Sequence, residues 1–145
     1  MAFPRVFGAP KIVIGATYLA AYALLDWLSF IEPYPPLGIT PWNPGIGLSF
    51  VLLLMFGRRM IPFVIVAPLL AAIVQRQSSL PWSFEIASSV LVGAIYSLAA
   101  LVLMRPSLRF EPALTSMRDL LLLMLLAAAS AACVAVGYVG LTVLA

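Results

Sequence analysis

Five apolar segments, each bounded by charged residues or proline, dominate this sequence and restrict what it can fold into. The chain is 64% hydrophobic and 9% charged, with a mean hydropathy of +1.14. Soluble domains are about 45–50% apolar and about 25% charged, so this chain cannot hide its apolar surface in one water-soluble core. The sequence therefore predicts an all-α, polytopic membrane helical bundle in which residues 1–145 form a single integral-membrane domain in the lipid bilayer. The predicted spans are residues 12–31, 44–57, 61–75, 84–104 and 120–145.

The lengths of these segments differ. Residues 12–31, 84–104 and 120–145 reach the roughly 20 residues that a helix needs to cross a ~30 Å hydrocarbon core. Residues 44–57 and 61–75 would extend only about 21–23 Å at a rise of ~1.5 Å per residue. Two arginines separate these short segments, and each arginine at the centre of a span costs about 2.5–3.5 kcal/mol. We therefore interpret them as a short helical hairpin, which gives about five transmembrane helices.

The placement of charge supports five spans. If the N-terminus is cytoplasmic, seven of the eight basic residues lie on the cytoplasmic side and only Arg76 lies outside. This distribution follows the positive-inside rule. The tryptophans Trp27, Trp42 and Trp82 then lie near the outer boundary, where aromatic belts form. We expect a multi-pass protein with a cytoplasmic N-terminus.

Several functional classes lack any signature in this sequence. There is no histidine, no glycine-rich phosphate loop, no metal-spaced set of cysteines and histidines, and no nucleophile–base pair. We therefore expect a protein that is not an enzyme by itself and that holds no cofactor and no metal. The net charge of +3 is explained by membrane topology, so it does not indicate a nucleic-acid partner.

The stretch "ITPWNPGIGLSF", residues 39–50, interrupts the apolar pattern. Pro44 suits the first turn of a helix, and Asn43 before it is a suitable N-cap. Because the helix is short, its N-terminus should begin below the outer surface, where irregular backbone survives only if it is buried in protein or lines a cavity. This predicts a positive helix end inside an outward-facing pocket. The alternative is that the prolines only shape a tight outer loop.

The first segment carries a polar stripe. Tyr18, Tyr22 and Asp26 follow one another at a spacing of four residues, which places them on one face of a helix. Asp26 would lie roughly 7–8 Å below the outer end of that helix. An ionisable residue at this depth needs a partner, and Arg76 is the best candidate. The alternative is a structural ion pair between two helices. The candidate ligand-binding residues are Tyr22, Asp26, Trp42, Asn43 and Arg76.

Other short patterns indicate structure rather than chemistry. Ser116 and Asp119 fit a capping box at the start of the last segment. Small residues recur every fourth position in two spans, and such stripes allow close helix packing in lipid. These stripes consist of Ser89, Gly93 and Ser97 in the fourth span and of Ala129, Cys133 and Gly137 in the fifth.

Three stretches together resemble a known family. They are "LLDWLSF", then "GITPWNPGIGLSFVLLLMFGRRMIPFVIVAPLLAAI", then "LTSMRDLLLLMLLAAASAACVAVG". The order of "W-N-P-G-x-G-L", "G-R-R-x-x-P" and "M-R-D" resembles the membrane-associated sensor (MASE) family, first type, from about Ala16 onwards. The resemblance implies a sensory domain of the bacterial inner membrane, placed before histidine kinase or diguanylate cyclase output domains. It would put residues 42–45 in the family's signature turn, and Arg58, Arg59 and Pro62 in its hairpin.

These observations lead to one functional hypothesis and two alternatives. We predict a sensory or signal-input module of a bacterial signal transduction system, such as a two-component system. Its expected partners are the bilayer, a histidine kinase or diguanylate cyclase domain or partner chain, and a second copy in a homodimer. The family module has about eight spans and this sequence has about five, so we expect an incomplete unit or a subunit. The alternatives are a small membrane transporter or permease membrane subunit, and a purely structural assembly subunit.

Overall fold

The computed structural model describes residues 10–29, 43–75 and 81–144, and all regular elements in these ranges are helical. This confirms the predicted all-α class. Two short 3₁₀ turns, η1 (Arg58–Met60) and η2 (Pro106–Leu108), accompany five α-helices. The α-helices are α1 (Lys11–Ser29), α2 (Pro44–Phe56), α3 (Ile61–Gln75), α4 (Trp82–Leu103) and α5 (Met117–Leu144).

Three of these helices are long and apolar enough to cross a membrane, judged by length and composition. They are α1, α4 and α5, with 19, 22 and 28 residues. Helix α2 has 13 residues and is a shorter apolar helix. The described helices therefore agree with a membrane protein, and α2 is as short as the sequence predicts.

Gly57 produces the predicted break between the two short helices. It has φ 78° and ψ −169°, a conformation that a residue with a Cβ rarely adopts. Its N–H donates to the Leu53 carbonyl, which ends α2, and η1 then leads into α3. After this turn, α2 and α3 each pack against α1 and α4. The two helices are therefore separate elements of one bundle rather than halves of one broken helix.

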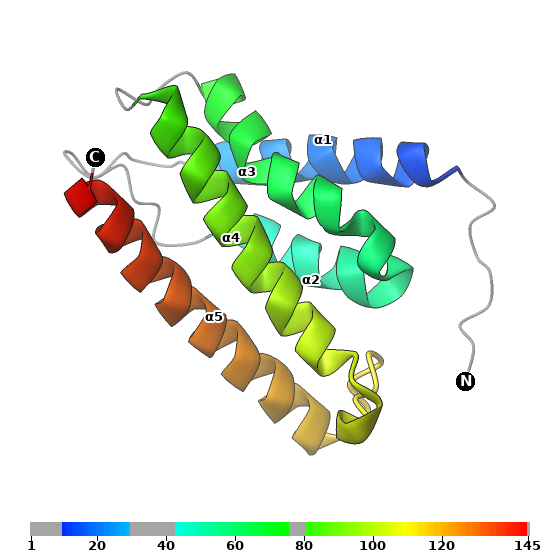
Figure 1. The fold of residues 1–145 in the computed structure, drawn as a ribbon. Coiled ribbons are helices and arrows are strands. Elements are labelled where there is room, and N and C mark those ends of the chain that lie inside the picture. Colours follow the sequence, from blue (N-terminus) through cyan, green and yellow to red (C-terminus); the bar gives the residue numbers. More distant parts are fainter. Residues whose placement is uncertain (1–9, 30–42, 76–80, 145) are drawn as a thin grey trace.

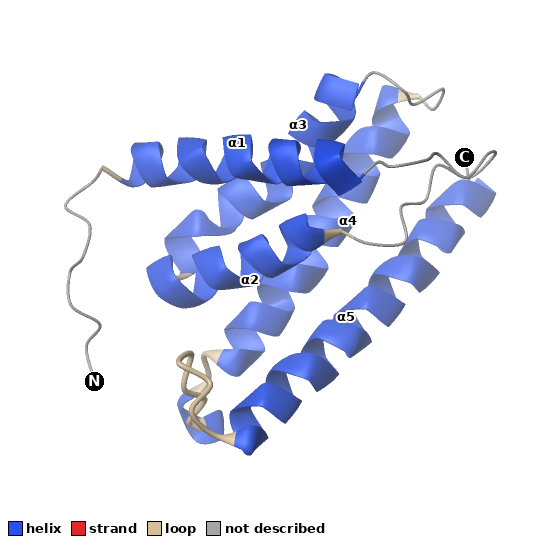
Figure 2. Cartoon of the chain, turned by 180° about the vertical axis from the view of Figure 1, so that it is seen from behind, coloured by secondary structure: helices blue, strands red, loops and turns tan. Residues whose placement is uncertain are grey.

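Helix α4 lies at the centre of the packing (Figure 1, Figure 2). It contacts α2, α3 and α5, while α1 covers α2 and α3. The buried side chains of α1 to α4 and η1 form one core, and its least exposed members are Leu53, Met60, Ala67, Ala100 and Leu103. The predicted small stripe of α4 faces this core, because Ser89, Gly93 and Ser97 are all buried. Gly93 lies against Ile65, so this stripe lets α3 approach α4 closely.

Helix α5 differs from the prediction in the face that it packs. It lies along α4, but Ala129 and Cys133 of the predicted stripe are exposed. The inward residue is instead Ser130, which is 5% exposed and donates to the Leu126 carbonyl. Gly137 does contact α4, through Leu91. The packing face of α5 is therefore rotated relative to the predicted stripe, so that Ser130 is buried and Ala129 and Cys133 are exposed.

The start of α5 is capped as predicted. The Asp119 N–H donates to the Ser116 hydroxyl oxygen at 3.2 Å, and that hydroxyl donates to Asp119 Oδ2 at 2.8 Å. Asp119 is 4% exposed, and within the described part of the chain its Oδ1 has no hydrogen-bond partner. The cap therefore fixes the residue at which α5 begins after the α4–α5 connection.

Candidate functional site

Asn43 caps α2 as the sequence predicts. It has extended backbone angles, φ −126° and ψ 92°, and its Oδ1 accepts a hydrogen bond from the Gly45 N–H at 3.0 Å. Pro44 occupies the first helical position, where the missing N–H has no helical partner to lose. The cap satisfies one of the free donors at this helix end.

The same side chain joins α2 to α1. Because its oxygen faces Gly45, the Asn43 amide nitrogen faces α1 and donates to Asp26 Oδ1 at 3.2 Å. The Tyr22 ring lies against Gly45, where an added Cβ would come within 2.7 Å of Cε2. The structure thus brings together three of the five predicted site residues.

The other two predicted residues, Trp42 and Arg76, lie outside the described residues. The predicted pair between Asp26 and Arg76 therefore stays a prediction. Asp26 itself is partly buried on α1 and is held by Asn43.

A second set of hydrogen bonds links α1 and α2 one turn further along α2. The Ser49 hydroxyl donates to the Gly45 carbonyl at 2.9 Å, and the Tyr18 hydroxyl lies 2.8 Å from the same Ser49 oxygen. A hydroxyl carries one proton, so Tyr18 donates to Ser49. Tyr18 and Ser49 are 4% and 3% exposed, which makes these bonds costly to leave unmade. We call the set Tyr18, Tyr22, Asp26, Asn43 and Ser49 the polar node.

Ser49 was missed by the sequence prediction. The sequence did contain an indication of its role. Ser49 lies four residues after Gly45 and therefore on the same face of α2 as the start of the helix. Tyr18 was recognised as part of the polar stripe but was not assigned to the site.

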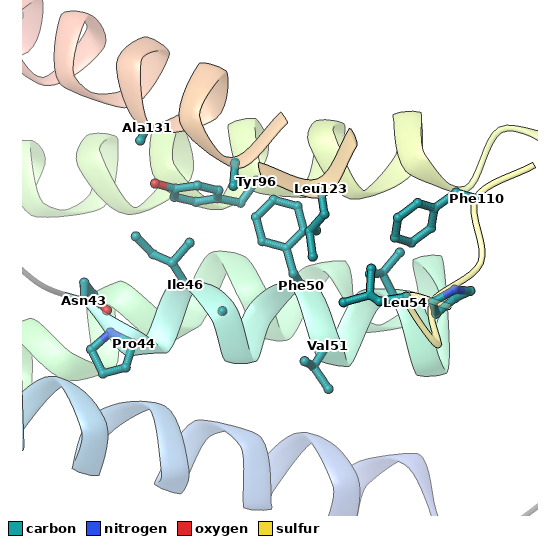
Figure 3. A pocket seen from close by; sticks show the side chains of 14 residues that line it. Asn43, Pro44, Ile46, Phe50, Val51, Leu54, Tyr96, Phe110, Leu123 and Ala131 are labelled. Carbon is teal, nitrogen blue, oxygen red and sulfur yellow. The ribbon is translucent and has the colours of Figure 1, made fainter. Parts of the chain in front are cut away.

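An elongated groove runs along the opposite side of α2 (Figure 3). It has a volume of about 580 Å³ and lies between α2 and α5, with Tyr96 of α4 on its floor. Phe50 meets the Tyr96 ring edge-on, with centroids 5.9 Å apart. The lining comprises Asn43, Pro44, Ile46, Gly47, Phe50, Val51, Leu54, Tyr96, Phe110, Pro112, Leu114, Leu123, Ala127 and Ala131.

Asn43 belongs to both the polar node and the groove. It lines one end of the groove and also holds Asp26 of α1. Tyr22 and Asp26 come from α1, which lies on the far side of α2 from the groove in Figure 3. The hollow beside Asn43 therefore opens toward α4 and α5, whereas the predicted pocket combined residues 42–45 with Tyr22, Asp26 and Arg76. Among the described residues, no group of three or more histidine, cysteine, aspartate or glutamate side chains could hold a metal ion.

Searches of protein families, of curated proteins and of solved structures found no match to this chain. The resemblance to the MASE family accordingly remains a prediction from the sequence motifs.

Proposed function

We propose that this chain is an integral-membrane sensory or signal-input module of the bacterial inner membrane, with five spans and a cytoplasmic N-terminus. The lengths of α1, α4 and α5 support three full spans. The short helices α2 and α3 are packed between α1 and α4, which supports their crossing as part of the same bundle. Seven of the eight basic residues lie on the cytoplasmic side in this topology.

The observation that carries the proposal is the double role of Asn43. An occupant of the groove at this end meets the residue that caps α2 and holds Asp26 of α1. Any occupant that favours one orientation of the Asn43 amide therefore changes the connection between the two helices. A ligand shifts a conformational equilibrium only if it binds the two states unequally, and Asn43 offers a contact that differs between such states.

The output would come from a partner, because the chain carries no catalytic signature. We propose a histidine kinase or diguanylate cyclase domain, or a partner chain that contains one. Support comes from the motif order around "W-N-P-G" and "G-R-R", which resembles the MASE family.

The test is complementation of a gene deletion in the host with wild type, Asn43→Ala, Asn43→Ser and Asp26→Asn. Serine retains a capping oxygen but is too short to reach Asp26, so it separates capping from the α1 contact. We expect all three variants to alter cellular cyclic di-GMP or the phosphorylation of a co-expressed kinase by several-fold, at unchanged membrane abundance. Variants that change abundance without changing the output would instead indicate a structural subunit.

Transport is the second candidate, because Asp26 places a carboxylate on an apolar helix where proton- or ion-coupled carriers place theirs. Proteoliposomes that contain the purified chain separate the two functions. Flux that disappears in Asp26→Asn would favour transport and would overturn the sensory proposal if no signalling output accompanies it.

A further inference from the structure

The groove between α2 and α5 has the shape and chemistry of a site for one hydrocarbon chain. Of its 14 lining residues, only Asn43 and Tyr96 carry polar side-chain groups. Its volume of about 580 Å³ falls in the usual range of ligand sites, roughly 300–1,000 Å³. From Pro44 to Leu54 it follows α2 for ~15 Å at ~1.5 Å per residue, which is half of a ~30 Å hydrocarbon core. This is the depth of one leaflet.

The groove is open along its side. Gly47 and Val51 of α2 and Ala131 of α5 line it and are exposed. The neighbouring surface of α5 is also apolar and exposed, as at Leu125 and Val136. In a bilayer this opening faces lipid tails, so an occupant can enter sideways without crossing water.

One end of the groove is strongly basic. Leu54 lies one turn before Arg58 and Arg59, and Phe110 follows Arg109 directly. Five described arginines of this end are exposed, and one of them, Arg118, donates to the Leu108 carbonyl. We call the other four, Arg58, Arg59, Arg105 and Arg109, the arginine end.

Nearby acidic groups offset this charge only in part. Glu111 is exposed and accepts a hydrogen bond from Thr115, while Asp119 is buried and is bonded to Ser116. Among the described residues of this region, positive charge therefore exceeds negative charge at the mouth of an apolar groove.

The segment that closes the arginine end has an unusual backbone. Arg109 has φ 44° and Leu114 has φ 52°, both in the left-handed region that residues with a Cβ rarely adopt. Phe110, Pro112 and Leu114 of this segment line the groove. Such conformations persist where the surrounding structure requires them, and they gather at ligand sites.

We propose that the groove binds one acyl chain of an anionic phospholipid whose phosphate lies over the arginine end. The apolar walls bury the chain, and the guanidinium groups pair with the phosphate. This inference goes beyond the proposed sensory function, because a lipid in the groove requires no signalling.

Native mass spectrometry of the purified full chain tests the proposal. The chain is titrated in detergent with phosphatidylglycerol or with phosphatidylcholine of the same acyl chains. We expect one phosphatidylglycerol to bind more tightly than the others, and about tenfold or more tightly than phosphatidylcholine. This ratio reflects net headgroup charge, because phosphatidylcholine carries the same phosphate but offsets it with a choline cation. Equal binding of the two lipids would overturn the proposal.

A matched pair of glycine variants separates groove binding from general lipid adhesion. Gly47→Leu places a side chain in the groove, and Gly140→Leu places the same side chain on α5 outside the lining residues. Neither added Cβ meets another atom within 4 Å, so both variants should fold, which circular dichroism checks. We expect Gly47→Leu to abolish the tight phosphatidylglycerol and Gly140→Leu to retain it. Retention in both variants would contradict the groove as the site.

Substitution of the arginines provides a third test. Each of Arg58→Gln and Arg109→Gln should weaken phosphatidylglycerol binding by roughly fivefold. Phosphatidylcholine binding should weaken by less, because its choline cation offsets the charge of the same phosphate. If phosphatidylglycerol binding does not weaken, the phosphate does not lie at the arginine end. If both lipids weaken equally, the arginines do not select an anionic lipid. Either result would contradict the proposal.

Discussion

Helices α4 and α5 are similar in hydropathy and opposite in environment. Their most apolar windows have hydropathies of 2.2 and 2.5, yet 44% of the α4 window is buried inside the molecule against 6% of the α5 window. Helix α4 contacts α2, α3 and α5, whereas α5 packs mainly along α4 (Figure 1). In a chain this apolar, hydropathy indicates that a helix avoids water but does not indicate whether protein or lipid surrounds it.

The glycines of the two helices show the same contrast. A Cβ on Gly93 of α4 would lie 2.5 Å from Ile65 Cα, which is backbone of α3. A Cβ on Gly137 of α5 would meet the Leu91 side chain, and a Cβ on Gly140 would meet nothing within 4 Å. Contact with backbone cannot be relieved by a rotamer change, so only the α4 glycine is required by the packing.

The largest effect should come from alanine at these glycines. We expect Gly93→Ala to destabilise the fold by about 1–3 kcal/mol, the usual range for overpacking. Gly140→Ala should be neutral or stabilising by up to about 1 kcal/mol, because alanine favours the helix. The change in unfolding free energy for Gly137→Ala should fall between these two values. Unfolding in mixed SDS micelles measures the free energies, and equal losses at Gly93 and Gly140 would break the comparison.

Buried serines of α2 and α5 extend the comparison. Ser49→Ala should destabilise the fold by about 1–3 kcal/mol, since it leaves the buried Tyr18 hydroxyl without its acceptor. Ser130→Ala should cost about 0.5 kcal/mol or less, because Ser130 bonds only to a carbonyl of its own helix. The same unfolding assay measures both.

The double variant Tyr18→Phe with Ser49→Ala serves as the control for this pair. Removal of both partners should recover most of the loss, because no buried hydroxyl is then unpaired. A loss in the double variant as large as the sum of the single losses would show that the hydrogen bond is not the cause.

Local features of the fold were predictable from the sequence. The third apolar segment, 61–75, coincides with α3, and the cap at Asn43 and the capping box at Ser116 are both present. These features are encoded within a few residues, by a proline in the first turn, a capping side chain and a glycine with positive φ. Asp26 and Asn43 were assigned to one candidate site and are joined by a hydrogen bond, although the predicted partner of Asp26 was Arg76.

The groove was not predictable in the same way. The groove depends on the distance between α5 and α2. Nearly every residue of both helices is apolar, so the sequence does not indicate which face of either helix packs. The stretch "AAASAACVAVG" offers small residues on all sides, which is why Ala129 and Cys133 were assigned to the packing face that Ser130 occupies. The sequence places the arginines of the groove's basic end together on the cytoplasmic side, but it does not show that a groove ends among them.

The central claim is that an occupant of the groove is coupled to α1 through Asn43. The distance between a spin label at Leu24→Cys on α1 and one at Cys133 on α5 tests it directly. Both side chains are exposed and lie outside the groove lining, and Cys133 is the single native cysteine. We predict different distance distributions in phosphatidylglycerol and phosphatidylcholine nanodiscs for wild type, and identical ones for Asn43→Ser. The same distribution in both lipids for wild type, or an unchanged response in Asn43→Ser, would contradict the account.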